Sequence, residues 1–349
     1  MRQKVTTILG IETSCDDTSA AIVCGNTVLS NVIAGQEVHR LYGGVVPELA
    51  SRAHQKSIVP VVDVALNKAG ISIDDIDAVA FTRGPGLLGS LLVGTSFAKA
   101  FCLAKGKPLI DVNHMVGHVL AHFIDRQGHE KPKFPFICLT VSGGHTQLVL
   151  VEDYLSMKVV GTTRDDAAGE AFDKAAKMLG FDYPGGPLID KHAAEGNPLA
   201  FSFNKPQISG LDFSFSGLKT SIMYFLNKAQ QKDPDFIAKH LADLCASIQH
   251  VIVDVLIEKL SKALETYPVQ DIAIAGGVSA NSGLRSSLLA FGEKHQKTIH
   301  IPPFEYCTDN AAMIAITGKY LFEKKAFSNQ HISASARLES SDENYLIRL

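Results

Sequence analysis

The hydrophobic and polar residues of this chain form two patterns, one typical of strands and one typical of helices, that alternate along its whole length. Short apolar runs rich in Val, Ile and Ala are typical of β-strands. We expect strands at residues 7–11, 20–24, 78–82, 109–112, 137–141, 147–151, 272–275 and 299–301. Apolar residues three and four positions apart are typical of helices. We expect helices at residues 47–69, 87–104, 116–125, 169–179, 235–265 and 282–294. The alternation favours an α/β fold.

A weak internal repeat indicates how these elements are organised. Residues 13–23 and 141–151 both fit a strand, a small polar turn and a second strand. When the two segments are aligned, Ser, Thr and Val coincide at three positions. This shared architecture predicts a duplicated, two-lobed fold with a cleft between two facing turns. Residues 131–135, just before the second copy, mark the expected boundary between the lobes.

Composition narrows the class of protein. A chain of 349 residues with 46% hydrophobic and 20% charged residues is globular and long enough for two domains. The net charge of −3 gives no sign of nucleic-acid binding, so any such surface would be a local patch. The six cysteines form no C-x-x-C pair, which indicates reduced residues of a cytosolic protein. Without a signal peptide or an apolar span of about 18 residues, we expect a cytoplasmic protein with no membrane segment.

Paired histidines carry the clearest chemistry. His114 and His118 are four positions apart, so on a helix their imidazoles share one face and can hold one metal ion. The Glu that would follow the first His of a zinc peptidase is absent, which argues against that class. His122 continues the same four-residue spacing, but it would need a bent geometry to reach the same ion. Asp309, at the start of a predicted helix, is either a favourable charge at the helix dipole or a third ligand. Two imidazoles and a carboxylate suit Fe(II) or catalytic Zn(II).

Glycine-rich turns follow several predicted strands. Residues 142–146 form either a hairpin turn or a phosphate cradle, and the two are compatible because glycine-turn amides bind anions. Residues 275–282 follow a strand and open a helix that Asn281 or Ser282 can cap. Together these turns favour a nucleotide cleft. Gly84-Pro85-Gly86, by contrast, fits a structural turn better than an anion site.

Two further carboxylates have plain structural interpretations. Asp173 fits the solvated face of a helix, and Asp190 ends another glycine turn that begins at Gly185. Neither position alone indicates a ligand.

Taken in order, these segments resemble one family, the tRNA adenosine threonylcarbamoyltransferases in their bacterial TsaD form. The matching residues are 10–18, 83–87, 113–118, 141–146, 169–174, 184–186, 276–281 and 307–313. Asp17 stands where many bacterial members have Glu, and the tail after about residue 330 matches nothing in the family pattern.

The resemblance implies a fold like that of actin, the heat-shock-70 proteins and the sugar kinases, with a duplicated mixed-sheet core and a central nucleotide cleft. Residues 1–133 would form the N-terminal lobe, rejoined by a C-terminal helix at about 312–349, and residues 134–311 the C-terminal lobe. By position, His114, His118 and Asp309 would hold one Fe(II) per chain, with Zn(II) as the alternative. The residues implied to bind the donor are Thr140, Val141, Ser142, Gly143, Gly144, Asp173, Gly186, Asp190 and Asn281.

The implied reaction transfers the threonylcarbamoyl group of threonylcarbamoyl-adenylate to N6 of adenosine 37, in tRNAs that read codons beginning with A. AMP leaves. The implied partners are a small inactive paralogue (TsaB-like) and a separate ATPase (TsaE-like). His145 and Asp16 are candidates for the base, and Arg83, Lys219 and Arg285 for tRNA contact. The alternatives are an ATP-dependent small-molecule kinase of the same fold, which would use Mg²⁺, and an ATP-driven assembly protein, which gives the histidines no role.

Overall fold

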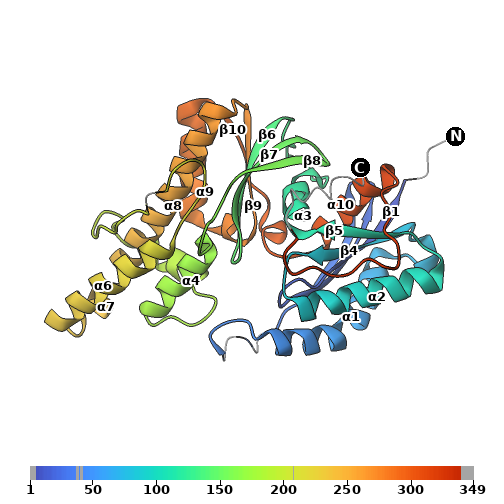
Figure 1. The fold of residues 1–349 in the computed structure, drawn as a ribbon, viewed down its shortest axis with the longest axis horizontal. Helices are drawn as coiled ribbons and strands as arrows, with labels where there is room; N and C mark the ends of the chain where they lie inside the picture. The colour runs from blue at the N-terminus through green and yellow to red at the C-terminus, as the bar shows by residue number, and fades with distance from the viewer. Residues whose placement is uncertain (1–4, 37–38, 40–41, 207, 339–349) are drawn as a thin grey trace. The chain divides into compact units, whose positions relative to one another are not determined.

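The structure is a computed structural model that describes residues 5–36, 39, 42–206 and 208–338. The chain divides into two compact units (Figure 1). The first unit comprises Met1–Pro132, Glu152–Lys158 and Pro302–Leu349, and the second comprises Lys133–Val151 and Val159–Ile301. That these units act as separate lobes stays a prediction.

The first unit contains a mixed five-stranded sheet in the order β3-β2-β1-β4-β5. Its strands are β1 (Thr7–Glu12), β2 (Thr18–Cys24), β3 (Thr27–Ala34), β4 (Ala78–Gly84) and β5 (Leu109–Asn113). The first three strands pair antiparallel, whereas β4 runs parallel to β1 and β5 runs parallel to β4. The carboxyl ends of β1, β4 and β5 therefore meet at one edge of the sheet.

The second unit repeats this arrangement, with the order β10-β9-β6-β7-β8. Its strands are β6 (Phe136–Val141), β7 (Thr146–Asp153), β8 (Ser156–Thr162), β9 (Asp271–Ala275) and β10 (Thr298–His300). β6 pairs antiparallel with β7 and parallel with β9, and β9 pairs parallel with β10. Counted from β6, the sheet has the same connectivity as the first sheet counted from β1. The predicted duplication and α/β class are confirmed.

Helices cover both faces of the first sheet. α1 (Pro47–Ala69) and α2 (Leu88–Lys105) pack on one face, while α10 (Ala311–Glu323) packs on β1, β2, β4 and β5. α10 lies directly against the strands because two glycines leave room for it. A Cβ on Gly10 would lie 2.8 Å from the Ala315 Cβ, and one on Gly318 would lie 2.4 Å from the Ala80 Cβ. This close approach fixes the start of α10, where Asp309 lies.

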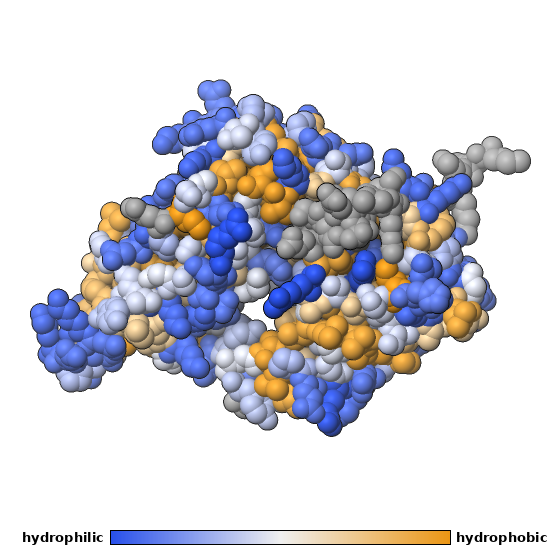
Figure 2. All heavy atoms as spheres, viewed as in Figure 1, coloured by the Kyte–Doolittle hydropathy of each residue, from blue (hydrophilic) through white to orange (hydrophobic). Residues whose placement is uncertain are grey.

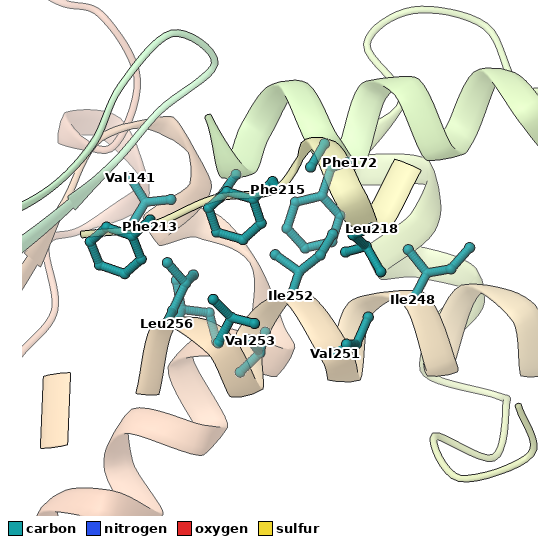
Figure 3. Packing of buried hydrophobic residues seen from close by; sticks show 14 of the residues in the cluster. Val141, Phe172, Phe213, Phe215, Leu218, Ile248, Val251, Ile252, Val253 and Leu256 are labelled. Carbon is teal, nitrogen blue, oxygen red and sulfur yellow. The ribbon is translucent and has the colours of Figure 1, made fainter. Parts of the chain in front are cut away.

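The core of the second unit forms around a long helix, α8 (Leu241–Thr266). Figure 3 shows Ile252 of α8 close to Phe172 and Phe215, and Val141 near Phe213 in the same cluster. The helices of this unit are α4 (Ala168–Met178), α5 (Gly186–Ala193), α6 (Ser216–Lys232), α7 (Phe236–Lys239), α8 and α9 (Ser282–His295). Because Val141 ends β6, this packing anchors the glycine turn that follows.

Three expectations about local structure were wrong. The helix predicted over 235–265 is broken at His240, whose φ of −121° and ψ of 22° lie outside the helical range, and whose ring packs on Phe236. The glycine turn at Gly185 instead opens α5, with Pro187 in its first turn, where proline is tolerated. The C-terminal helix ends at Glu323 rather than continuing to the tail; the last part of that range, residues 339–349, lies outside the described residues.

The helix α2 contains a long apolar span, which we did not expect from the sequence. By length and composition, Leu88–Lys105 could cross a membrane, and 33% of this helix is buried inside the structure. Core helices of other proteins pass the same test, and α2 packs on α1 and β4. Leu88, Leu92 and Leu103 remain exposed, and hydrophobic residues are visible over this part of the surface in Figure 2.

Candidate metal centre and donor-binding loops

Two histidines are presented by the helix α3 (His114–Leu120), which follows β5 directly. The Asn113 side chain caps this helix, because its Oδ1 accepts the N–H groups of Met115 at 2.9 Å and Val116 at 3.3 Å. His114 is the first residue of α3 and His118 lies one turn later. Their rings are 4.7 Å apart and nearly perpendicular, at 88°. The predicted shared face is confirmed, although the helix begins two residues earlier than expected.

A second asparagine cap places Asp309. Asn310 Oδ1 accepts the N–H of Met313 at 3.0 Å and so begins α10. Ser19 Oγ on β2 accepts the N–H of Ala311 at 2.8 Å, which ties the same turn to the sheet. Asp309 is therefore held two residues before the first residue of α10, a helix that is itself fixed against the first sheet.

These elements bring His114, His118 and Asp309 together, with one ligand atom from each within 4.8 Å of the others. Asp309 Oδ1 lies 3.4 Å from His114 Nε2 and 3.2 Å from His118 Nε2. His118 is buried; its Nδ1 makes no hydrogen bond to any described residue, and its Nε2 faces Asp309 Oδ1 without forming a well-aligned hydrogen bond. A buried nitrogen without a partner costs free energy. Coordination of a metal ion by Nε2 would remove that cost, so these three residues fit such an ion.

The charges of the trio are strongly coupled. Burial by itself would lower the pKa of His114, but the carboxylates of Asp309 and Glu12 raise it to about 10. Burial lowers the pKa of His118. Burial would raise the pKa of Asp309, yet the two imidazoles hold it well below its usual range.

One residue beside the trio was missed by sequence reasoning. Glu12, which is fully buried at the end of β1, has its Oε2 3.0 Å from His114 Nδ1. Ser14 Oγ lies 3.2 Å from the same nitrogen. A carboxylate at the end of an apolar strand was visible in the sequence, but its histidine partner lies 102 positions away. His122, in contrast, stacks on His129 and does not belong to the trio.

In the second unit, the glycine turn joins β6 to β7. Ser142 N donates to His145 O at 2.8 Å, which closes the hairpin. Gly143 and Gly144 are exposed, and within the described chain no hydrogen bond uses their N–H groups. The start of α4 packs on this turn, because a Cβ on Gly169 would lie 2.6 Å from Ser142 O. The turn therefore combines the hairpin with two available amide donors.

Asp173 and Gly186 lie together. Asp173 Oδ1 accepts the N–H groups of Gly185 at 2.9 Å and Gly186 at 3.1 Å. The solvated helix face expected for Asp173 was wrong, since the side chain is half-buried and caps α5 from α4. Burial raises its pKa, and these two hydrogen bonds oppose that rise.

Asp190 and the segment around Asn281 also lie together. The Asp190 carboxylate accepts the N–H and the hydroxyl of Ser282, the hydroxyl at 2.7 Å. Asn281 caps α9 through Leu284 N and donates to Gln249 Oε1 at 2.7 Å. The predicted asparagine cap is confirmed. Both polar groups of Asn281 are used inside the second unit.

The chain matches known proteins closely. The sequence model of the TsaD family, tRNA N6-adenosine threonylcarbamoyltransferase, matches residues 27–316. Curated relatives with that name include one from Christiangramia forsetii, 57% identical over 95% of this chain and 97% of the relative. Another, from Porphyromonas gingivalis, is 59% identical over 90% of this chain and 93% of the relative.

The chain belongs to the tRNA N6-adenosine threonylcarbamoyltransferase family. It is thus an enzyme of the transferase class that acts in tRNA modification.

Distant solved structures share the fold of this family member. Component A of the Acidaminococcus fermentans (R)-2-hydroxyglutaryl-CoA dehydratase is 18% identical, with a TM-score of 0.52 over 92% of this chain and 99% of that one. HypF from T. kodakarensis is 11% identical, with a TM-score of 0.61 over 92% of this chain and 48% of its own. These likenesses confirm the actin-like fold class.

The candidates for the base and for tRNA contact lie in both units. Asp16 lies in the β1–β2 turn of the first unit and His145 in the β6–β7 turn of the second. Arg83 pairs with Asp111 at 3.3 Å, and Arg285 donates to a backbone carbonyl, whereas Lys219 is exposed. The structural interpretation of the Gly84 turn is supported. The N–H groups of Gly86 and Leu87 there are occupied by carbonyl oxygens, so they are not free for an anion.

Proposed function

We propose that this family member transfers the threonylcarbamoyl group from threonylcarbamoyl-adenylate to N6 of adenosine 37, in tRNAs reading codons that begin with A, with release of AMP. The observation that carries the proposal is the convergence of His114, His118 and Asp309 around one point. The family supplies the reaction type, and the trio supplies a place where a carbonyl can be activated.

The metal would be held by the two Nε2 atoms and the Asp309 carboxylate. When bound, Fe(II) or Zn(II) supplies a Lewis acid that polarises the carbamoyl carbonyl. The asparagine caps of α3 and α10 hold the three ligands in place before the ion arrives. Such preorganisation avoids the cost of assembling the site during each binding event.

The donor would be bound by the second unit. Gly143 and Gly144 offer two exposed N–H groups to the phosphate and to the charge that AMP carries as it leaves. Thr140 and Val141 end the buried strand that presents this turn. Asp173 would hold the loop at Gly186, and Asp190 would hold the start of α9, so that adenine and ribose meet a fixed surface.

The acceptor amine is a poor nucleophile, because its lone pair is delocalised into the adenine ring. The chain must therefore activate the carbonyl more than the amine. Adenosine 37 lies in the anticodon loop, where an unpaired base can be splayed into a pocket at modest cost. His145 and Asp16 remain candidates for accepting the proton. We propose action in the cytoplasm, together with a TsaB-like paralogue and a TsaE-like ATPase.

The test is incubation of the purified protein with synthetic threonylcarbamoyl-adenylate and unmodified tRNA, with and without the two partner proteins. Mass spectrometry of the digested tRNA should show threonylcarbamoyl-adenosine at position 37 and stoichiometric AMP. A kinase of the same fold would instead consume ATP with Mg²⁺ and modify a small molecule. If neither modified adenosine nor AMP appears, even with both partner proteins present, the proposed transfer is wrong.

A further inference from the structure

A buried carboxylate supports the trio from the side opposite the expected ion. Glu12 is completely buried, accepts two hydrogen bonds and lies against the ring of His114. Its Oε2 receives the Thr82 hydroxyl at 2.6 Å and faces His114 Nδ1 at 3.0 Å, while Oε1 receives the N–H of Ser14. Burying a carboxylate costs several kcal/mol unless such donors compensate it. The burial of the Glu12 carboxylate therefore indicates a specific role for this residue.

The topology of the first sheet explains why these residues meet. Glu12 ends β1, Thr82 lies near the end of β4, and His114 follows β5. Because β1, β4 and β5 are parallel neighbours, their carboxyl ends lie at one edge of the sheet. The Glu12–Thr82 contact therefore joins adjacent strands, and the Glu12–His114 contact reaches past β4 to the residue that follows β5.

The contact determines which nitrogen of His114 is free. A neutral imidazole carries one N–H, and a carboxylate at Nδ1 accepts that hydrogen. The lone pair then lies on Nε2, the nitrogen that faces Asp309 at 3.4 Å. Such a carboxylate–histidine pair fixes the ring orientation and raises the electron-donating strength of the coordinating nitrogen.

We propose that Glu12 is a positioning residue, which fixes the tautomer and orientation of His114 for the metal ion. This inference rests on the metal site in the proposed function. Thr82 in turn holds Glu12 in place, because its hydroxyl donates a hydrogen bond to the Glu12 carboxylate. His118 has no such carboxylate among the described residues, so the two histidines contribute unequally to the site.

The second unit offers a matched control. There the Asp271 carboxylate lies 3.0 Å from His300 Nε2, and both side chains are buried. The pair has the chemistry of Glu12 and His114 but lies outside the group of possible metal ligands. Asp271→Asn therefore tests the loss of any buried carboxylate–histidine contact.

The experiment measures Co(II) binding to the metal-stripped full-length chain by its visible absorption spectrum. Glu12→Gln keeps a neutral acceptor for Nδ1–H and should raise the Kd for Co(II) about tenfold, whereas Glu12→Ala should raise it up to about a hundredfold. The spectrum should shift in both variants, since the ligand field of His114 changes. Asp271→Asn should leave both the Kd and the spectrum as in wild type.

Folded Glu12 variants with the wild-type Kd and spectrum overturn the inference. If the Glu12 variants do not fold, Thr82→Val replaces the threonine with a side chain of similar size and removes one restraint on Glu12. It should then weaken Co(II) binding about threefold, and an unchanged Kd in that variant counts against Glu12. A wild-type chain that takes up no Co(II), Fe(II) or Zn(II) would overturn the proposed metal role itself. That failure is distinguishable, because it appears before any variant is compared.

Discussion

The two candidate regions use their polar groups in opposite ways. In the first unit, the ligand atoms of His114, His118 and Asp309 lie close to one another, and among the described residues His118 Nε2 has the Asp309 carboxylate beside it but no well-aligned hydrogen bond. In the second unit, the polar side chains of Asp173, Asp190 and Asn281 are already engaged with loop amides and side chains. At the glycine turn, the N–H groups of Gly143 and Gly144 make no hydrogen bond to any described residue.

This contrast indicates different kinds of contribution to one reaction. Side chains left without partners are suited to bind a ligand directly, whereas satisfied side chains shape the surface that a ligand meets. We therefore expect the first unit to govern the chemical step and the second to govern donor affinity. Substitutions in the first unit should lower kcat, and those in the second should raise KM.

The largest expected effect comes from removing both imidazoles. His114→Ala combined with His118→Ala should abolish metal binding and lower the transfer rate by about a thousandfold, because several kcal/mol of carbonyl activation are lost. Metal content per chain and the rate of adenosine modification are the measurements. His122→Ala is the matched control, since His122 is a buried histidine on the following turn that lies outside the trio. Full activity in the metal-stripped double variant would end the metal hypothesis.

A smaller effect is expected from crowding the glycine turn. In Gly169→Ala the new Cβ would lie 2.6 Å from Ser142 O and displace the turn. Overpacking of this kind costs about 1–3 kcal/mol, so the KM for the adenylate donor should rise about tenfold with kcat little changed. Gly217→Ala makes the same substitution at the second residue of α6, where a Cβ meets nothing within 4 Å. Equal KM values in the two variants would show that the turn does not bind the donor.

The sequence predicted the elements whose limits are set by neighbouring residues. It missed the elements that depend on exposed edges or on residues far away in the chain. The helix α1 matches its predicted range because Pro47 lies in its first turn and Gly70 ends it in a left-handed conformation. The edge strands β3 and β8 were missed, since their partly exposed residues lack a continuous apolar run. In α5 a glycine pair resembled a turn, but Asp173 supplies the cap from another helix.

The same distinction holds at the candidate site. The spacing of His114 and His118 is local, so a helical pattern could group them. Asp309 was included by residue type and by family resemblance, and only the packing of α10 on the first sheet places it beside them. The role inferred for Glu12 depends on three parallel strands, which no short-range pattern reveals.

Substitutions of Asp173 test whether this side chain contacts the donor directly or only supports the loop that the donor meets. Asp173→Asn keeps an oxygen that can accept the N–H groups of Gly185 and Gly186, whereas Asp173→Ala leaves both amides without that acceptor. Losing the acceptor costs about 1–3 kcal/mol. We expect the donor KM to rise about tenfold in the alanine variant and less than about threefold in the asparagine variant. If both variants lose the same affinity, the charge itself contacts the donor.

The smallest expected effect concerns Asp165. Like Asp173 and Asp190, this carboxylate in the second unit accepts backbone N–H groups of another segment. It accepts the N–H groups of Phe215 and Ser216 at the start of α6. Partial burial would raise the pKa of Asp165, but the hydrogen bonds from Ser214, Phe215 and Ser216 together lower it. Because the pKa is lower in the folded chain, the stabilisation is present above the ordinary Asp value of about 3.9 and is lost as the pH falls through the lower folded value.

Asp165→Ala should therefore lower the free energy of unfolding by about 1 kcal/mol near neutral pH, the usual cost of losing a helix cap. Thermal unfolding followed by circular dichroism at several pH values measures this. Asp182→Ala is the control, since Asp182 is exposed and its side chain makes no hydrogen bond within the described residues. The difference between wild type and Asp165→Ala should shrink below about pH 4. A difference that stays constant with pH would mean that Asp165 stabilises α6 by packing, and the contrast between the units would then rest on Asp173 and Asp190.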